Sequence, residues 1–226
     1  MEIELLHIQT EFAVVNKPPG LLMHKSAMAR DVKENLQDVL EEQLGKKVYL
    51  VHRLDRKTSG CVLVAFNSEI ASFFAGQFKD RLVEKEYHAI VRGHLKESVS
   101  NSRSLEDERG VMQEAETDFE PVKLTELGVC SGKYPTTRLT FLKAYPKTGR
   151  THQIRKHLAQ LRHYIVNDKP HGDCKLNKAM EQQMNVQHMM LHARSIAFME
   201  PNQDEKTVVE ASYFEQFSTL LRSFED

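Results

Sequence analysis

One stretch of the chain gathers charged groups that could do chemistry, the nine residues HRLDRKTSG at positions 52–60. Its one carboxylate, Asp55, is preceded by Arg53 and followed by Arg56 and Lys57. Nearby cations favour the ionised form of a carboxyl group, so Asp55 has the surroundings of a nucleophile or a base at neutral pH. The same residues also fit a surface turn in which Asp55 merely pairs with an arginine, and composition alone does not separate the two interpretations.

Other common catalytic patterns are absent from the sequence. It contains no HExxH or CxxC motif, so we expect no metal ion. It contains neither GxxxxGK[ST] nor GxGxxG, which disfavours a nucleotide-dependent mechanism, and GxSxG is missing as well. Cys61, Cys130 and Cys174 are far apart in the sequence, which argues against a disulfide framework. We therefore expect a reaction that needs no cofactor.

Charge is unevenly distributed along a chain whose formal net charge is -1. Residues 143–175 hold eight Lys or Arg and two Asp, whereas residues 97–126 hold nine acidic and three basic side chains. Such polarity suits a protein with one anion-binding face, such as a nucleic-acid binder. A solvated charge run without a partner is the alternative.

The length and composition fit a soluble globular protein. The chain has 226 residues, of which 40% are hydrophobic and 28% are charged, and this suffices for one domain with a sizeable core. The N-terminal segment lacks the basic and apolar regions of a signal peptide, and no run approaches the ~20 apolar residues that span a bilayer. We expect a cytoplasmic protein without membrane contact.

Short apolar runs are expected to position the charged segment. Residues 48–51 and 61–66 have the composition of buried strands, so HRLDRKTSG is predicted to be a loop between them. A further run over residues 12–15 predicts a strand that ends at NKPPG, residues 16–20, where the prolines and the glycine force a turn.

Helical and strand patterns are mixed along the rest of the chain. Apolar residues at helical spacing predict helices over residues 31–44, 69–82, 151–162 and 213–224. Strand patterns occupy residues 87–91, 139–145, 164–166 and 191–198, and residues 96–126 predict an irregular excursion or an extended hairpin. Because βαβ alternation is not strict, we expect an α+β fold, a single domain over residues 1–226 on a mixed, mostly antiparallel sheet with flanking helices.

The motifs resemble those of the RluA family of pseudouridine synthases. HRLDRKTSG matches the family signature HRLDxxTSG at all seven specified positions. Four further motifs follow the family's order, NKPPG at 16–20, KEY at 85–87, KTGRTHQIR at 147–155 and LHA at 191–193. The resemblance covers nearly the whole chain and implies a catalytic domain with a central RNA-binding cleft.

The resemblance implies roles for individual residues. Asp55 is expected to attack or deprotonate the target nucleoside, and Arg53 to fill the gap that a flipped-out uridine leaves, as a planar guanidinium can. Tyr87 is expected to stack on the uracil, and Arg155 to pair with the catalytic carboxylate. Leu191 resembles a residue that packs under the base. Plain alternatives stay open: an ion pair for Arg53, a half-buried strand tyrosine for Tyr87 and an ordinary core leucine for Leu191.

Three basic residues near Arg155 are candidates for contacts with RNA phosphates. They are Arg150, Lys156 and Arg162. Contacts of this kind position the RNA without reading its sequence. The family's reaction cleaves the N1–C1′ bond, rotates the uracil and rejoins it through C5 without a cofactor; the sequence leaves open which first step Asp55 takes.

Three further segments of the sequence bear on which RNA is the substrate. The segment YPTTR at 134–138, together with residues 157–163 and 168–173, resembles the TruC branch of the family, which modifies position 65 in the acceptor-stem region of tRNA. NKPPG begins at residue 16, so we expect no S4-type RNA-binding domain before it, and we expect a monomer. The alternatives are the same chemistry on ribosomal RNA or another tRNA site, a non-catalytic RNA-binding protein, and a hydrolase that uses Asp55 with His52.

Overall fold

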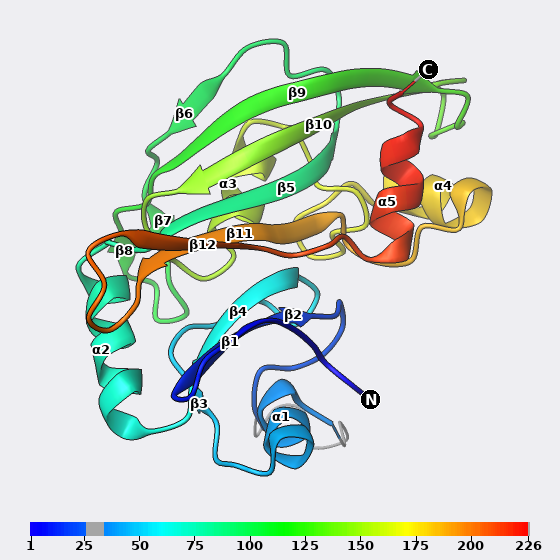
Figure 1. The fold of residues 1–226 in the computed structure, drawn as a ribbon. Helices are drawn as coiled ribbons and strands as arrows, with labels where there is room; N and C mark the ends of the chain where they lie inside the picture. Colours follow the sequence, from blue (N-terminus) through cyan, green and yellow to red (C-terminus); the bar gives the residue numbers. More distant parts are fainter. Residues whose placement is uncertain (26–33, 226) are drawn as a thin grey trace. The chain divides into compact units, whose positions relative to one another are not determined.

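The computed structural model describes residues 1–25 and 34–225, and the chain forms two compact units (Figure 1). The first unit comprises Met1–Lys85 and Ala193–Tyr213, and the second comprises Glu86–His192 and Phe214–Asp226. In the described part of the chain, no helix is long and apolar enough to cross a membrane.

The first unit is built on strands in the order β1-β2-β4-β11, with β3 beside β4 and β12 beside β11. The pairs β1–β2, β2–β4, β3–β4 and β11–β12 are antiparallel. Its elements are β1 Glu4–Ile8, β2 Phe12–Lys17, α1 Leu36–Leu44, β3 Tyr49–Leu50, β4 Ser59–Ala65, α2 Ser68–Lys79, β11 Leu191–Met199 and β12 Lys206–Glu210, with the first two residues of β11 in the second unit.

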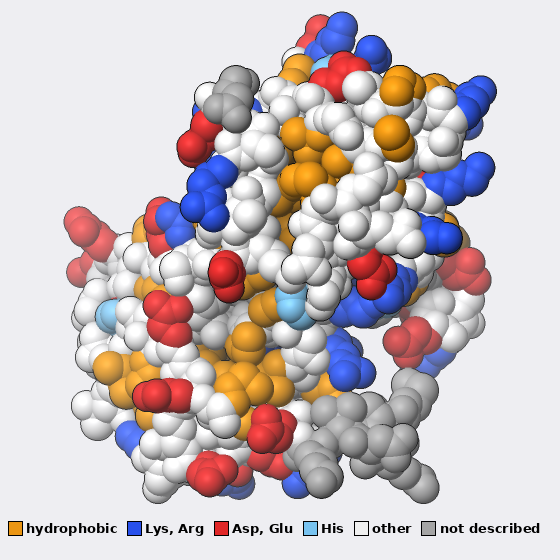
Figure 2. Space-filling view, turned by 90° about the vertical axis from the view of Figure 1, so that its right-hand side faces the viewer, with side chains coloured by type: hydrophobic (Ala, Val, Ile, Leu, Met, Phe, Trp, Pro, Cys, Tyr) orange, Lys and Arg blue, Asp and Glu red, His pale blue; other side chains and the backbone are white. Residues whose placement is uncertain are grey.

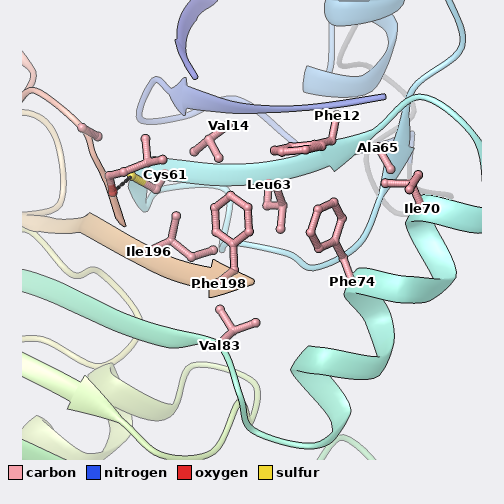
Figure 3. Close-up of a cluster of buried hydrophobic side chains, with 12 residues drawn as sticks. Phe12, Val14, Cys61, Leu63, Ala65, Ile70, Phe74, Val83, Ile196 and Phe198 are labelled. Atoms are coloured by element: carbon pink, nitrogen blue, oxygen red, sulfur yellow. Dashed lines mark hydrogen bonds between the residues drawn. The ribbon is translucent and has the colours of Figure 1, made fainter. Parts of the chain in front are cut away.

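The core of the first unit lies between its strands and α2 (Figure 3). Alternate residues of β2 and β4 point to the same face, and there the rings of Phe12, Phe74 and Phe198 meet edge to face with centroids 5.1 to 5.8 Å apart. All seven residues of β4 are buried. The loop that carries Asp55 runs directly into this buried strand.

The second unit is built on strands in the order β5-β10-β9-β6, and the pairs β5–β10, β10–β9 and β9–β6 are antiparallel. Thr117 on one face is hydrogen-bonded to α3, and Phe141 on the other face contacts aromatic rings in and beside α5. Its elements are β5 Glu84–Arg92, β6 Val99–Asn101, β7 Leu105–Glu106, β8 Met112–Gln113, β9 Thr117–Leu127, β10 Thr137–Pro146, α3 Gln153–Gln160, α4 Cys174–Met184 and α5 Glu215–Arg222, with the first two residues of β5 in the first unit.

The predicted α+β fold with mostly antiparallel strands is confirmed, while several local predictions need correction. The expected strand at 164–166 is wrong, because Ile165 forms only an isolated bridge with Val91. The expected helix at 31–44 begins at Leu36, since the side chain of Asn35 caps it, and residues 31–33 lie outside the described residues. The helix α4, capped by Asp173, was not predicted.

Two other predictions differ only in extent. The helix expected at 151–162 is shorter and corresponds to α3. His152 before it and Arg162 after it have left-handed backbone conformations, with φ of 56° and 61°, which do not continue a helix. The excursion expected over residues 96–126 consists of β6, the small hairpin β7–β8 and the long strand β9.

Candidate active site

The loop between β3 and β4 in the first unit carries Asp55 and Arg53. The N–H of Thr58 donates to the carbonyl of Asp55 at 3.1 Å, which closes a turn after the carboxylate. Leu54 is buried and anchors the loop, whereas Arg53 is exposed and Asp55 is half-buried. Asp55 is therefore held by a structured loop and remains accessible to a reacting molecule.

Gly60 fixes where this loop enters β4. Its φ is 110°, and a Cβ atom at this position would lie 2.2 Å from the carbonyl oxygen of Ala193 in β11. Only glycine tolerates both the left-handed conformation and this approach of two backbones. The TSG and LHA motifs thus meet in the first unit at one glycine.

Lys17 supports the loop that carries Asp55 by a hydrogen bond to its backbone, although no function was predicted for this lysine from the sequence. The side chain is fully buried, and Nζ donates to the carbonyls of Pro18, Leu21 and Arg56 at 3.0, 2.9 and 3.0 Å. Burial lowers the pKa of Lys17 to about 7, and the charge of Asp55 partly opposes that shift.

The NKPPG turn is therefore joined to the segment that carries Asp55. The N–H of Gly20 donates to the carbonyl of Arg56 at 2.9 Å, and Nε of Arg56 donates back to the carbonyl of Gly20 at 2.9 Å. These two bonds and the Lys17 ammonium act on the residue that directly follows Asp55. The arrangement restrains the backbone of the carboxylate before any substrate binds.

His52 has a structural role. Its Nε2 accepts from the N–H of Leu63 at 2.9 Å, and its ring stacks on Phe78 with centroids 4.6 Å apart. Burial, with the charge of Lys85, lowers the pKa of His52 to about 3. The imidazole is thus neutral, with its proton on Nδ1, and Nε2 is occupied as an acceptor. This geometry counts against the hydrolase that would use Asp55 with His52.

Arg155 in the second unit forms a buried bidentate pair with Asp168. Nε lies 2.7 Å from Oδ2 and Nη2 lies 2.8 Å from Oδ1, and both side chains are at most 4% exposed. Burial alone would raise the pKa of Asp168, but the hydrogen bonds and charge of Arg155 outweigh it and lower the pKa. The sequence named Arg155, but it did not indicate that Asp168 orients it.

The Asp168 segment is held in place by its own neighbours. The side-chain amide of Asn177 in α4 donates to the carbonyl of Asp168 at 2.9 Å. A Cβ atom on Gly172 would lie 2.0 Å from that carbonyl oxygen, so the chain fits closely there. Beside it, Nδ1 of His152 and Nε2 of His171 are 2.9 Å apart, which requires at least one of these rings to be neutral.

Other residues of the second unit with a predicted role lie within strands or donate hydrogen bonds to backbone carbonyls. Tyr87 is half-buried in β5 opposite Ala144 of β10, and Leu191 is buried at 3% exposure. Arg150 Nε donates to the carbonyl of Glu114 at 2.9 Å, and Lys156 Nζ donates to that of Glu106 at 2.9 Å.

Arg150 and Lys156 therefore anchor the segment around the β7–β8 hairpin to the start of α3, which is a structural task beside the predicted phosphate contacts. Arg162 is exposed just after α3. The structure thus brings Arg150, Arg155 and Lys156 together in and beside α3, and it places Arg53 and Asp55 together in the loop of the first unit.

Comparison with known proteins shows what this chain is similar to. Residues 11–160 match the family model described as RNA pseudouridylate synthase. The chain belongs to this family. RNA pseudouridylate synthases are isomerases that convert uridine to pseudouridine in RNA, so the reaction class expected from the motifs is confirmed.

Curated relatives and solved structures agree with this assignment. The chain is 37% identical to tRNA pseudouridine synthase C of Vibrio parahaemolyticus, covering 100% of this chain and 96% of the relative. It is 35% identical to tRNA pseudouridine synthase C of Salmonella typhimurium, covering 98% of this chain and 90% of the relative.

Among solved structures, human RNA Pseudouridylate Synthase Domain Containing 4 matches with a TM-score of 0.75 at 21% identity, covering 98% of this chain and 93% of that chain. Human RNA Pseudouridylate Synthase Domain Containing 1 matches with a TM-score of 0.71 at 23% identity, covering 99% and 95%. These two likenesses show the synthase fold.

Proposed function

We propose that this pseudouridine synthase acts on tRNA, at the uridine in position 65 of the acceptor-stem region, with Asp55 as the catalytic carboxylate. Relatives of 34 to 37% identity over nearly the whole chain carry the name tRNA pseudouridine synthase C. The segments at 134–138, 157–163 and 168–173 point to the same branch. The preorganised loop around Asp55 is the structural observation that carries the catalytic assignment.

Asp55 acts on the target nucleoside from this loop. The buried Lys17 ammonium and the Gly20–Arg56 hydrogen bonds restrain the adjoining backbone, so little reorganisation is needed when the substrate binds. Arg53, which is exposed in the same loop, occupies the space left by the extruded uridine.

Residues of the second unit supply the remaining proposed roles. Tyr87 stacks on the uracil, Leu191 packs under it, and Arg155 pairs with the catalytic carboxylate and orients it. The bidentate bond to Asp168 supports this role for Arg155, because it fixes the plane of the guanidinium. Arg150, Lys156 and Arg162 contact phosphates.

Residues 1–226 work as a single catalytic domain that needs no cofactor, and the protein is a cytoplasmic monomer whose partner is RNA. Two alternatives for function are the same reaction on ribosomal RNA or another tRNA uridine, and RNA binding without catalysis.

The test is to incubate the purified enzyme with unmodified tRNA and ribosomal RNA transcripts and to map pseudouridine by chemical labelling and primer extension. We expect one modified site, at position 65 of tRNA, and its complete loss in Asp55→Ala. Asp204→Asn serves as the control, since it removes an exposed carboxylate of the same unit. Modification of ribosomal RNA alone would contradict the proposed substrate, and activity in Asp55→Ala would contradict the catalytic role.

A further inference from the structure

The second unit contains a hollow that the assignments above do not use. It has two adjoining parts of about 310 and 450 Å³, which share Arg92, Ser131 and Tyr134 in their walls. The walls come from the end of β5, from the turn between β9 and β10 and from the first residues of α4. Cavities of this size hold small ligands, and one nucleotide of a longer chain fits the same space.

Positive charge is in excess around this hollow. Two ion pairs fix charged side chains of its walls, Arg92 with Asp173 and Arg138 with Glu126. Lys133 and Lys175 line the same hollow and add two positive charges that these pairs do not neutralise. Figure 2 views the molecule from the side where Figure 1 draws α4, and its upper part shows Lys and Arg, with some Asp and Glu, around hydrophobic side chains. The hollow therefore attracts anions.

An aromatic ring is displayed at the hollow. Tyr134 is 52% exposed and sits in a tight turn, in which the N–H of Ser131 donates to the carbonyl of Tyr134 at 3.0 Å. The ammonium of Lys133 lies 5.5 Å from the centre of the Tyr134 ring. An exposed ring beside a cation is the combination on which a nucleic-acid base stacks while its phosphate is neutralised.

The hollow is preformed, because hydrogen bonds hold the residues around it. Oγ1 of Thr137 donates to the carbonyl of Val129 at 2.8 Å, and the N–H of Gly93 donates to the carbonyl of Arg138 at 2.7 Å. The side chain of Gln183 in α4 bonds both the N–H and the carbonyl of Cys130 at 3.0 Å. Little conformational entropy is lost when a ligand enters such a site.

We propose that this hollow binds a nucleotide of the substrate RNA other than the target uridine, with a base on Tyr134 and phosphates at Lys133 and Lys175. Arg92 lies five residues along β5 from Tyr87, which is roughly 17 Å in an extended strand. A ligand of the hollow and a uracil stacked on Tyr87 are thus too far apart to belong to one nucleotide. The inference rests on the proposed function and extends it to substrate selection.

The chemistry favours RNA over a protein partner. The walls offer a stacking surface, unneutralised ammonium groups and the hydroxyl-bearing residues Ser131 and Thr136, and these match a base, a phosphate and a ribose. A free nucleotide presents the same groups, so the experiment must separate the two sources.

The experiment compares steady-state kinetics of Tyr134→Ala and of the double variant Lys133→Glu/Lys175→Glu on whichever RNA the wild-type enzyme modifies. Lys178→Glu is the matched control, because Lys178 is an exposed lysine of α4 outside the walls of the hollow. We expect the double variant to raise KM about tenfold while kcat stays within about twofold. The slope of log KM against the logarithm of the salt concentration should decrease by about 1.5, since two phosphate contacts are lost.

Three outcomes would overturn the inference. One is an unchanged KM in the double variant and in Tyr134→Ala, and another is an equal rise of KM in Lys178→Glu. The third uses uridine monophosphate as a probe: binding that the double variant abolishes, with KM for RNA unchanged, would identify a free-nucleotide site. A wild-type enzyme that modifies ribosomal RNA would instead contradict the proposed substrate, and the KM comparison on that RNA would still test the hollow.

Discussion

The ammonium of Lys17 donates to the carbonyl of Arg56 at 3.0 Å, and Arg56 is the residue that follows Asp55 in the chain. Lys17, a buried residue of the NKPPG motif, thus supports the backbone beside Asp55 in the HRLDRKTSG motif. The ammonium also donates to the carbonyls of Pro18 and Leu21, in the loop that follows β2. One side chain thus links that loop to the loop that carries Asp55. The lysine acts by positioning the loop.

Replacing Lys17 by methionine tests this support. The variant keeps the length of the side chain but leaves the carbonyls of Pro18 and Leu21 without this donor, while the carbonyl of Arg56 keeps the N–H of Gly20. Each unsatisfied buried group costs about 1–3 kcal/mol. We expect Lys17→Met to lower the free energy of unfolding by about 3 kcal/mol and to reduce kcat more than it raises KM. Denaturant unfolding and steady-state kinetics measure the two effects; wild-type values of both would refute the positioning role.

The pH dependence of stability gives a second test of Lys17. Burial holds the pKa of Lys17 near 7 in the folded protein, whereas an unfolded lysine titrates near 10.5. Between these values the unfolded chain binds more protons, so this residue makes stability rise as pH increases from about 7 to about 10.5. The difference in unfolding free energy between wild type and Lys17→Met should therefore grow over this window. A difference that shrinks with rising pH would contradict the assignment.

Gly60→Ala tests the contact between the TSG and LHA motifs. The new Cβ would lie 2.2 Å from the carbonyl of Ala193 at a φ of 110°, so either β11 or the Asp55 loop must move. We expect a loss of at least about 3 kcal/mol of stability and a large fall in kcat. Gly76→Ala in α2 is the matched control, since its Cβ meets open space and alanine favours a helix by about 1 kcal/mol. Equal stability of the two variants would exclude the steric argument.

Asp168→Ala tests whether Asp168 orients Arg155. The substitution removes the carboxylate that pairs with a buried guanidinium, so we expect a loss of about 3–5 kcal/mol. The double variant Arg155→Met/Asp168→Leu should recover part of that stability, because it removes both buried charges of the pair, but it should stay inactive. Thermal denaturation and activity assays of the three proteins form the measurement. Full activity in Asp168→Ala would show that Arg155 needs no orienting partner.

Local patterns in the sequence predicted the elements that flank Asp55, because buried strands and an amphipathic helix leave periodic apolar residues. They did not predict the burial of Lys17, since lysine is normally exposed and its partner Arg56 is 39 residues away. The signal was present, because Lys17 directly precedes two prolines and a glycine in a motif of the resemblance. Asp168 lies in a segment of the resemblance, but its pairing with Arg155 arises only from the folded chain.

The helix α4 and the run at 164–166 show a second limit of sequence patterns. The apolar residues of α4 are few and stand among polar ones, so the helix depends on the Asp173 cap and on packing of Leu176 and Met180. The run around Ile165 is apolar because it is buried, yet only one bridge to Val91 forms there. Burial and strand pairing leave the same signature in a short apolar run.

Single-turnover pseudouridine formation by Asp55→Asn, measured with excess enzyme on the RNA that the wild type modifies, tests the central claim most directly. The substitution removes the charge of the carboxylate and keeps its shape. The account predicts a rate at least about 10⁴-fold below that of the wild type, with the dissociation constant for RNA changed less than about threefold. A rate within tenfold of the wild type would contradict the assignment of Asp55 as the catalytic residue.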